Sequence, residues 1–305
     1  MTEAWAVYRE LAHSPGRETD DALILRSVAE KLDFSVALKT PDEVIDEPSA
    51  PPLVLVMCER LEILGTLRRW EQQGSLLINT PAAIFETYRH RMIEAFARDG
   101  VSFPKSELIA LCHPERSEGP ACHVTTGHVA NPNVANANVA NGHVASGSFA
   151  ALRMTGGCWV KRADVHATEA GDVQFAADES ALQRALSNLK ARGITRAVLQ
   201  QHVPGDLIKF YGAGDWFVWF YHRDQKLNGH AFEIARLRDA ARKAAGALGV
   251  EIFGGDAIVQ RDGDLSIIDL NAWPSFALYR DEASTHIAAY VAARVEALEM
   301  KCKTS

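Results

Sequence analysis

Three oxygen-bearing side chains in the last fifth of the sequence have the types and spacing of a divalent-cation site. Asp256 lies in one apolar segment, and Asp269 and Asn271 lie two residues apart in the next. Residues two apart in a strand project from the same face, so Asp269 and Asn271 are expected to point the same way. Magnesium, or manganese, prefers such oxygen ligands and completes its coordination with water and phosphate. Taken alone, however, an Asp-x-Asn triplet more often ends a strand and opens a turn.

Residues upstream strengthen the metal interpretation because they suit a nucleotide. Lys161 and Lys209 lie in predicted strands, from which their ammonium groups could reach phosphate. A strand lysine by itself is more often a surface residue with an apolar stem. Strand-edge backbone groups that could read an adenine are offered by Gln200-Gln201-His202-Val203. Together with the oxygen ligands, these residues predict a site for ATP and its metal ion.

The first 80 residues are the first set of elements that could position this site. Strands are predicted at residues 4–8, 34–38, 53–57 and 76–78, and helices from Asp20 or Asp21 and over residues 61–73. The run at 53–57 is continuously apolar, as a strand buried on both faces requires. Strand alternating with helix predicts a doubly wound parallel sheet. A further helix, capped by Thr80, is predicted to run to Arg98.

The second half of the chain has a mixed α+β pattern. The segments 208–211 and 216–221 flank a glycine-containing turn and predict a hairpin. Other strands are predicted at 158–162, 197–203, 253–260 and 265–270, with helices at 179–192, 234–248 and 285–300. The candidate ligands Asp256, Asp269 and Asn271 therefore fall on or next to two consecutive strands.

Residues 111–155 interrupt this pattern with a low-complexity segment. The segment is rich in Asn, Ala, Val, Gly and His and repeats a Val-Ala-Asn motif. Because it lacks the leucine and aromatic residues that bury a core, we predict a flexible insertion without a chemical role. An alternative zinc site would use Cys112, Cys122 and the nearby histidines, but their spacing matches no standard zinc pattern.

Composition narrows the class of protein. The chain has 305 residues, of which 47% are hydrophobic and 23% charged, as is ordinary for a soluble globular protein. Its formal net charge of −7 argues against general nucleic-acid binding. No signal peptide opens the sequence, and no apolar run approaches the roughly 18 residues that span a membrane. Five widely spaced cysteines form no disulfide framework, so the predicted compartment is the cytoplasm.

Taken together, these motifs resemble those of the ATP-grasp superfamily, outside the insertion and the N-terminal fringe. The resemblance implies an N-terminal α/β lobe at 1–80 and two α+β lobes at 81–205 and 206–305 that clamp ATP. It places Lys161 on the phosphates, residues 200–203 at the adenine, and the three oxygen ligands on magnesium. It also implies that a basic residue of the helix after Thr80 reaches the nucleotide, with Arg91 as the candidate and Arg89 close behind. The loop after Lys161 departs from the superfamily, because it holds one glycine where many members have several.

Within the superfamily, the motifs look most like the inositol 1,3,4-trisphosphate 5/6-kinase branch. That resemblance implies contacts of His166, Lys209, His222 and Arg223 with an anionic substrate, although Ser275 stands where a glycine is usual. Arg17, in the loop after the first strand together with His13, is a further candidate for substrate contact. The expected activity is transfer of the ATP γ-phosphoryl group to a small anionic substrate.

Two alternatives to the kinase stay open. One is a carboxylate–amine ligase that works through an acyl phosphate, as in the wider relatives of the glutathione synthetase and ribosomal-protein modification type. The other is a non-catalytic nucleotide-binding module. The sequence identifies neither the acceptor nor the oligomeric state.

Overall fold

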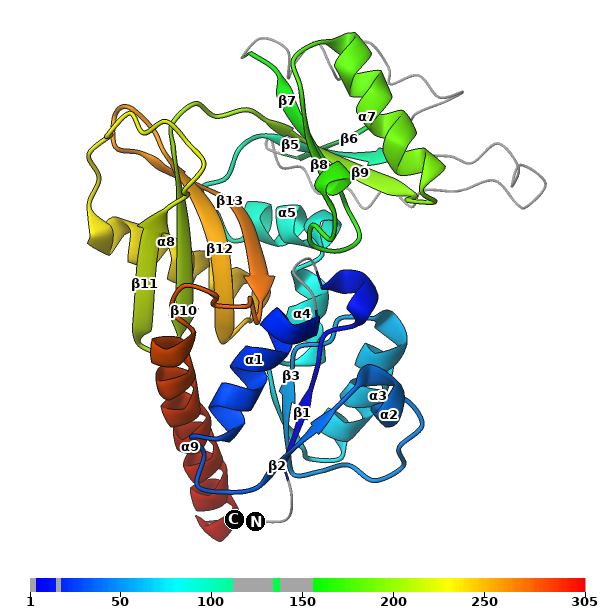
Figure 1. Cartoon of the computed structure of the whole chain (residues 1–305), viewed down its shortest axis with the longest axis vertical. Coiled ribbons are helices and arrows are strands. Elements are labelled where there is room, and N and C mark those ends of the chain that lie inside the picture. The colour runs from blue at the N-terminus through cyan, green and yellow to red at the C-terminus, as the bar shows by residue number, and fades with distance from the viewer. Residues whose placement is uncertain (1–3, 15–17, 112–133, 138–155, 305) are drawn as a thin grey trace, which may run out of the picture. The chain divides into compact units, whose positions relative to one another are not determined.

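The computed structural model describes residues 4–14, 18–111, 134–137 and 156–304 (Figure 1). It divides into two compact units. Unit 1 consists of Met1–Thr87 and Gly205–Ser305, and unit 2 consists of Tyr88–Pro204. Both ends of the sequence therefore build one unit. The division into three lobes at 1–80, 81–205 and 206–305 stays a prediction.

A four-stranded parallel sheet opens unit 1, which confirms the doubly wound prediction. The strand order is β2-β1-β3-β4, so the chain reverses direction across the sheet between β1 and β3. Leu25 of one helix packs in the core with Ala6 and Leu55, whereas Trp70 of another stacks edge-on against Trp5. The two helices thus cover opposite faces. The strands are β1 (Ala4–Val7), β2 (Val36–Lys39), β3 (Leu53–Val56) and β4 (Leu76–Ile78), and the helices are α1 (Glu18–Ala29), α2 (Pro41–Val44) and α3 (Leu61–Gln72).

Two predicted helix boundaries in this region were wrong. Helix α1 begins at Glu18, so Asp20 and Asp21 lie inside its first turn and not at the cap position. The helix predicted from Thr80 to Arg98 is two helices, α4 (Pro81–Glu86) and α5 (Arg89–Arg98). The break falls where Tyr88 adopts an extended backbone with ψ 129°. Thr80 caps α4 as predicted, because its side chain accepts a hydrogen bond from the amide of Ala83.

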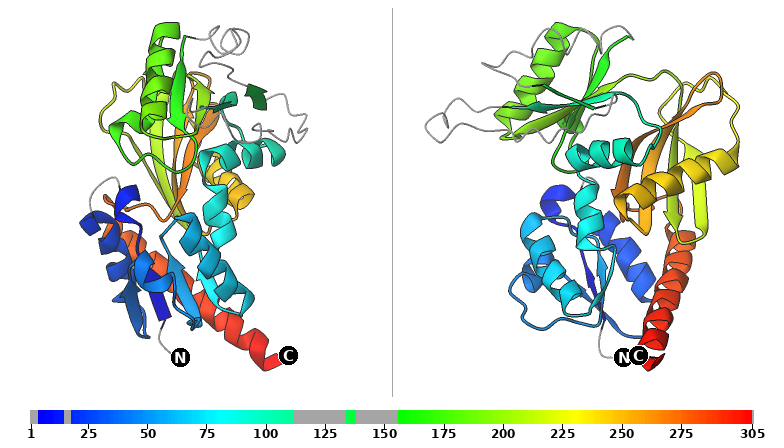
Figure 2. Two further views of the ribbon diagram at one scale, coloured as in Figure 1. Left: turned by 90° about the vertical axis from the view of Figure 1, so that its right-hand side faces the viewer. Right: turned by 180° about the vertical axis from the view of Figure 1, so that it is seen from behind.

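An antiparallel sheet forms the other half of unit 1. Its order is β11-β10-β12-β13, and helix α8 packs against it, whereas α9 packs along α1 (Figures 1 and 2). The predicted hairpin is confirmed as the pair β10 and β11. The elements are β10 (Asp206–Ala213), β11 (Trp216–Tyr221), α8 (Ile234–Leu248), β12 (Ile252–Val259), β13 (Leu265–Ala272) and α9 (Arg280–Thr304).

Buried polar groups join the two sheets of unit 1. The Asn79 side chain, fully buried after β4, donates to the carbonyl of Ile252 at 2.8 Å and accepts from the amides of Glu251 and Ile252. The indole of Trp273 donates to the carbonyl of Ile78 at 3.0 Å. Trp273 and Phe276 also fill the core that the parallel sheet shares with α1 and α9. The ends of β12 and β13 are thereby held against the parallel sheet.

Unit 2 is a five-stranded sheet in the order β6-β5-β9-β7-β8. Helix α7 covers one face through Leu182, Leu186 and Leu189, and Ile93 of α5 packs with Val198. Of the predicted insertion only Leu111 and Val134–Ala137 are described, the latter as a strand beside β5; the zinc candidates Cys112 and Cys122 lie outside the described residues. The elements are β5 (Ser106–Ala110), β6 (Val134–Ala137), β7 (Cys158–Arg162), β8 (Val173–Ala176), α7 (Glu179–Ala191) and β9 (Arg196–Gln201).

In the part of the chain that the structure describes, no helix combines the length and apolar character needed to cross a membrane.

Candidate functional site

A row of charged side chains crosses three strands of the antiparallel sheet in unit 1. Lys209 of β10 lies opposite Asp256 of β12, which lies opposite Asp269 of β13. Directly opposed residues in a sheet project from the same face, so the three side chains are neighbours. The ammonium of Lys209 donates to Asp256 Oδ1 at 2.7 Å. Asn271, two residues beyond Asp269, belongs to the same face and lies opposite Gly254.

A bulge in β13 puts the carboxylate of Asp269 on this face. Asp256 pairs with Asp269, but the next residue, Ala257, pairs with Ile267, so Ile268 is an extra residue. Such a bulge re-aims the side chains on its two sides. As a result Ile267 is fully buried on the apolar face, although strict alternation would put it on the same face as Asp269.

The charge on Lys209 follows from its partners. Burial lowers the pKa of this lysine, but the charge of Asp256 and the hydrogen bond to it more than offset burial, so the pKa is raised above its ordinary value. Lys209 therefore stays a cation at neutral pH and is held beside the candidate ligands. Its side chain keeps 35% of its surface exposed, and that of Asp256 25%.

The donor set on this face fits magnesium. It offers two carboxylates and one amide oxygen, and Asp269 is 8% exposed. No group of three or more His, Cys, Asp or Glu suited to a metal occurs among the described residues. Phosphate and water would therefore have to complete the shell, which is the arrangement that magnesium adopts at nucleotide sites. The residues that could hold it are Asp256, Asp269 and Asn271.

Lys161 and the predicted adenine-reading segment lie in unit 2. Lys161 is 5% exposed and pairs across the sheet with Val198 of β9. The predicted strand 197–203 ends at Gln201. The amides of Gln201 and His202 donate to the carbonyls of Lys105 and Gly157. These two amides of the segment therefore already bond within unit 2.

The loop after Lys161 has a single glycine, and interactions of its side chains fix its conformation. Asp172 is fully buried and accepts hydrogen bonds from the amide and hydroxyl of Thr168 at 2.7 and 2.8 Å. It also pairs with Arg162 and Arg192. Burial raises the pKa of Asp172, but these hydrogen bonds and charges hold it well below its ordinary range. The buried carboxylate of Asp172 lies at the end of the loop and binds Arg162 at its start, so it fixes both ends.

Of the two basic residues considered on α5, Arg89 contacts the Lys161 strand. Arg89 is buried, and its guanidinium donates to the carbonyls of Val165 at 3.0 Å and Arg162 at 3.3 Å. Arg91 instead pairs with Glu94 one turn along the helix, at 3.2 Å.

The remaining described substrate candidates belong to both units. His166 is half-buried in the loop after β7, and Arg223 is exposed after β11. The Nδ1 atom of His222 accepts a hydrogen bond from the amide of Asp224 at 3.2 Å, which stabilises a turn. Arg17 lies outside the described residues. Within unit 1 the structure brings together Lys209 and the three oxygen ligands, whereas the ring of His222 bonds within its own turn.

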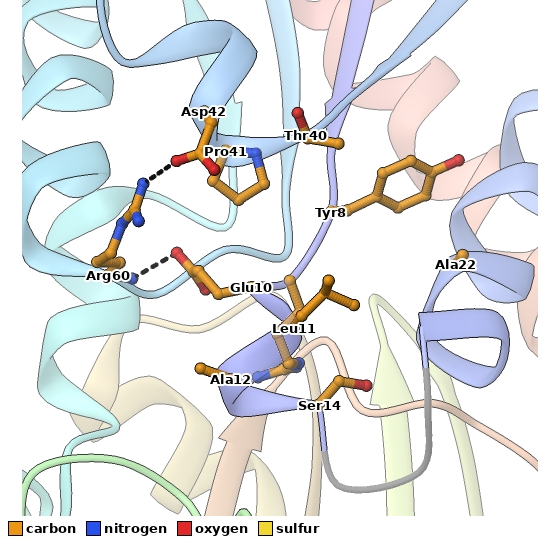
Figure 3. Close-up of a pocket in the computed structure, with 11 residues that line it drawn as sticks. Tyr8, Glu10, Leu11, Ala12, Ser14, Ala22, Thr40, Pro41, Asp42 and Arg60 are labelled. Carbon is orange, nitrogen blue, oxygen red and sulfur yellow. Dashed lines mark hydrogen bonds and ion pairs between the residues drawn. The ribbon is translucent and has the colours of Figure 1, made fainter.

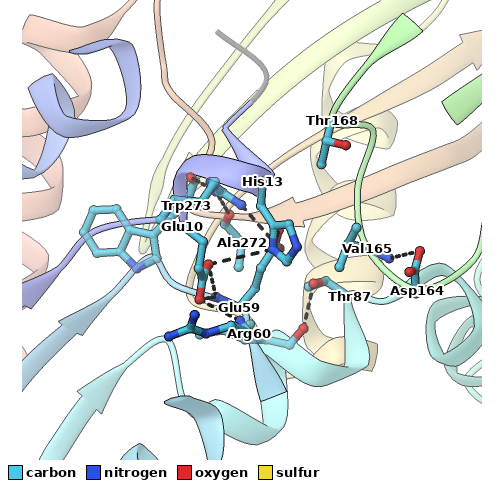
Figure 4. Close-up of polar contacts among 12 residues, drawn as sticks. Glu10, His13, Glu59, Arg60, Thr87, Asp164, Val165, Thr168, Ala272 and Trp273 are labelled. Carbon is cyan, nitrogen blue, oxygen red and sulfur yellow. Dashed lines mark hydrogen bonds and ion pairs between the residues drawn. The ribbon is translucent and has the colours of Figure 1, made fainter. Parts of the chain in front are cut away.

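Sequence reasoning named His13 in the loop after the first strand but missed the buried polar cluster to which it belongs, at the carboxyl ends of β1 and β3. Glu10 accepts hydrogen bonds from the amides of Glu59 and Arg60, and His13 Nδ1 lies 3.2 Å from Glu59 (Figure 4). Arg9 pairs with Glu59 at 3.3 Å. Charged residues directly after two buried parallel strands were the signal, because ligands bind at this edge of a doubly wound sheet.

A cavity of about 330 Å³ opens beside this cluster (Figure 3). Glu10 and the ion pair of Arg60 with Asp42, at 2.5 Å, supply its charges. Tyr8, Leu11 and Pro41 supply apolar surface. The size suits a small polar molecule with an apolar part.

Comparison with known proteins finds the same architecture in solved structures. A RimK domain ATP-grasp protein from Sphaerobacter thermophilus superposes with a TM-score of 0.62 at 14% identity, covering 94% of this chain and 98% of that one. D-alanine–D-alanine ligase from Bacillus anthracis, complexed with ATP, gives 0.66 at 11% identity, over 99% and 100%. The ATP-grasp ligase PsnB with a minimal precursor gives 0.61 at 15%, over 98% and 100%. No protein-family model matches the chain, and no curated protein matches it in sequence.

The chain therefore has the ATP-grasp fold, as its motifs predicted. At these identities the likeness establishes the fold alone, and the chemistry must be argued from the residues.

Proposed function

We propose that the protein is an ATP- and magnesium-dependent enzyme that joins a carboxylate to an amine. The observation that carries the proposal is the row Lys209–Asp256–Asp269 with Asn271 on one sheet face. This face combines a fixed cation with the oxygen ligands of a magnesium–phosphate complex. Bound ATP would supply the phosphoryl group that activates the acceptor carboxylate, and bound magnesium would neutralise the negative charge of that phosphoryl group.

Each protein residue has a defined part in this proposal. Asp256, Asp269 and Asn271 hold the metal, and Lys209 adds positive charge beside them. Lys161 and the Gln200–Val203 segment would bind the phosphates and adenine from unit 2. Catalysis then rests on positioning and electrostatics, with no covalent enzyme intermediate.

The position of Lys209 favours the ligase over the kinase that the sequence resemblance suggested. In the kinase interpretation Lys209 contacts a phosphorylated substrate. Its ammonium is paired at 2.7 Å with Asp256, one of the proposed metal ligands, and this pairing supports a role beside the metal. The Nδ1 atom of His222, another substrate candidate of the kinase interpretation, accepts a hydrogen bond within its own turn. The solved ligases of the same fold agree with this choice.

Variants of the metal face test the proposal first. Asp269→Ala and Asn271→Ala are expected to lower ATP turnover about 100-fold or more while circular dichroism and the melting temperature stay near wild type. The control is Asp262→Ala, which removes an exposed carboxylate from the turn of the same hairpin. Normal magnesium-dependent turnover in the first two variants would remove these residues from the metal site.

The nucleotide side of the proposal is tested by binding. Lys161→Ala is expected to weaken ATP binding by about 10- to 100-fold, since a hydrogen bond to a charged group contributes roughly 1.5–3 kcal/mol. Isothermal titration calorimetry measures this directly. An unchanged affinity would exclude Lys161 from the site.

Product analysis separates the ligase from its alternatives. With ATP labelled at the γ-phosphate, a ligase releases labelled inorganic phosphate only when both a carboxylic acid and an amine are present. A kinase would leave the label on a single acceptor, and a nucleotide-binding module would bind ATP without turnover. Screening pairs of acids and amines against single acceptors therefore decides between the three.

A further inference from the structure

Arg9, just after β1, holds the main chain that leaves the metal-binding strand. Its guanidinium donates to the carbonyl of Trp273 at 2.8 Å and to that of Ala272 at 3.2 Å. The same side chain pairs with Glu59 at 3.3 Å, and both side chains are about 5% exposed. Ala272 directly follows Asn271, so the arginine binds the carbonyls of the first two residues after this candidate ligand.

The backbone at this point needs such support. Trp273 has a φ of 43°, in the left-handed region that non-glycine residues disfavour. Three groups keep it there: its amide donates to Ile252, its indole donates to Ile78, and Arg9 binds its carbonyl. Residues held in a disfavoured backbone conformation persist only where their surroundings over-determine them. Loss of Arg9 would let the chain after Asn271 relax toward commoner angles.

The arginine is itself fixed by the parallel sheet. Glu59, its partner, follows β3, and its backbone amide donates to Glu10 at 3.0 Å. The planar guanidinium binds one carboxylate and two carbonyls at once, which a lysine ammonium cannot reproduce with the same geometry. A rigid support therefore runs from the ends of β1 and β3 to the end of β13.

We propose that Arg9 is a positioning residue for the metal site, acting through the peptide groups of Ala272 and Trp273 to orient Asn271. The inference rests on the proposed function, because it requires Asn271 to be a metal ligand. Removal of a group that orients a metal ligand without touching the metal itself typically changes metal affinity by about 10- to 100-fold. Arg9 thus couples metal binding to the integrity of the carboxyl edge of the parallel sheet.

Three variants separate positioning from stability. Arg9→Met removes the guanidinium partner of the buried Glu59 carboxylate, which then keeps His13 at 3.2 Å, and destabilises the fold. The double variant Arg9→Met/Glu59→Gln removes both charges and is expected to recover most of the melting temperature. Arg9→Lys keeps the positive charge but lacks the planar guanidinium with its several N–H donors. Leu67→Ala, which truncates a fully buried apolar side chain on α3, is the control for simple destabilisation.

The readout is manganese binding to protein saturated with ADP, measured as free Mn²⁺ by electron paramagnetic resonance. Arg9→Lys and the double variant are expected to lose about 10-fold or more in Mn²⁺ affinity, whereas Leu67→Ala keeps the wild-type value. Hydrogen exchange of residues 271–279 is expected to quicken in the same two variants. Wild-type Mn²⁺ affinity in the double variant would overturn the inference and leave Arg9 a structural residue.

The variant Asp269→Asn tests the proposed metal site independently of Arg9. If this variant loses Mn²⁺ while the Arg9 variants bind it normally, the metal site stands and only the role of Arg9 is wrong. If Asp269→Asn binds Mn²⁺ like the wild type, the metal site is wrong and the role of Arg9 falls with it.

Discussion

Replacing Asn79 by alanine is expected to detach the antiparallel sheet of unit 1 from the parallel sheet. The side chain of Asn79 is fully buried and makes three hydrogen bonds to the backbone of Glu251 and Ile252, at 2.6, 2.8 and 3.0 Å. Ile252 is the first residue of β12, the strand that carries Asp256. The perturbation therefore acts where the candidate metal strands meet the rest of unit 1.

The magnitude follows from the groups that lose a partner. Each hydrogen bond contributes about 1 kcal/mol net, and a buried group left unsatisfied costs roughly 1–3 kcal/mol. The amides of Glu251 and Ile252 both lose their acceptor, whereas the carbonyl of Ile252 still receives the amide of Trp273. We expect Asn79→Ala to lower the free energy of unfolding of unit 1 by about 3–5 kcal/mol.

Urea denaturation followed by tryptophan fluorescence measures this loss. Of the six tryptophans only Trp159 lies in unit 2, so the signal reports chiefly on unit 1. With a slope of about 3 kcal/mol/M, the midpoint is expected to fall by about 1 M or more. The neighbouring control, Thr80→Ala, removes only the cap of α4 and is expected to cost about 1 kcal/mol. A loss in Asn79→Ala no larger than in this control would refute the assigned role of Asn79.

Two further predictions concern charges. Lys209→Met is expected to lower ATP turnover about 100-fold. It is expected to lower the free energy of unfolding by at most about 1 kcal/mol, because the ion pair with Asp256 is partly exposed. Turnover assays and equilibrium unfolding measure the two effects, and a larger loss of stability would contradict the prediction. Asp172 has a pKa held below its ordinary 3.8, so its contribution to stability is present above that pH and is lost as the pH falls further. Below about pH 5 the melting temperature should therefore drop more steeply in the wild type than in Asp172→Asn, whereas parallel slopes would argue against this contribution.

Sequence periodicity was enough to predict most elements that carry the site. The apolar run at 53–57 is β3, and the segments flanking Gly212–Asp215 are the hairpin of β10 and β11. The rules behind these predictions act over a few residues, since side-chain alternation and turn chemistry are local properties. The ATP-grasp motifs were recognisable for the same reason, because each lies within one short segment.

Such local rules could not predict the boundaries of helices or the pairing registers of strands. The break between α4 and α5 at Thr87 and Tyr88 has no proline or glycine to mark it. The bulge at Ile268, which separates the faces of Ile267 and Asp269, comes from pairing with β12. A one-residue change of register moves a side chain to the other face of a sheet, so the composition of the metal face depended on pairing that the sequence does not display.

By itself the sequence determined the kinds of residue available for chemistry: two carboxylates, an amide and two strand lysines, each on a recognisable element. Only the tertiary structure decided which of them are neighbours. It paired Lys209 with Asp256 across two strands and brought Arg9 to the carbonyls of Ala272 and Trp273, more than 260 residues along the chain. Local preferences act within a turn or a strand, whereas contacts of this kind arise when separate segments are packed into one core and each buried polar group must find a partner there.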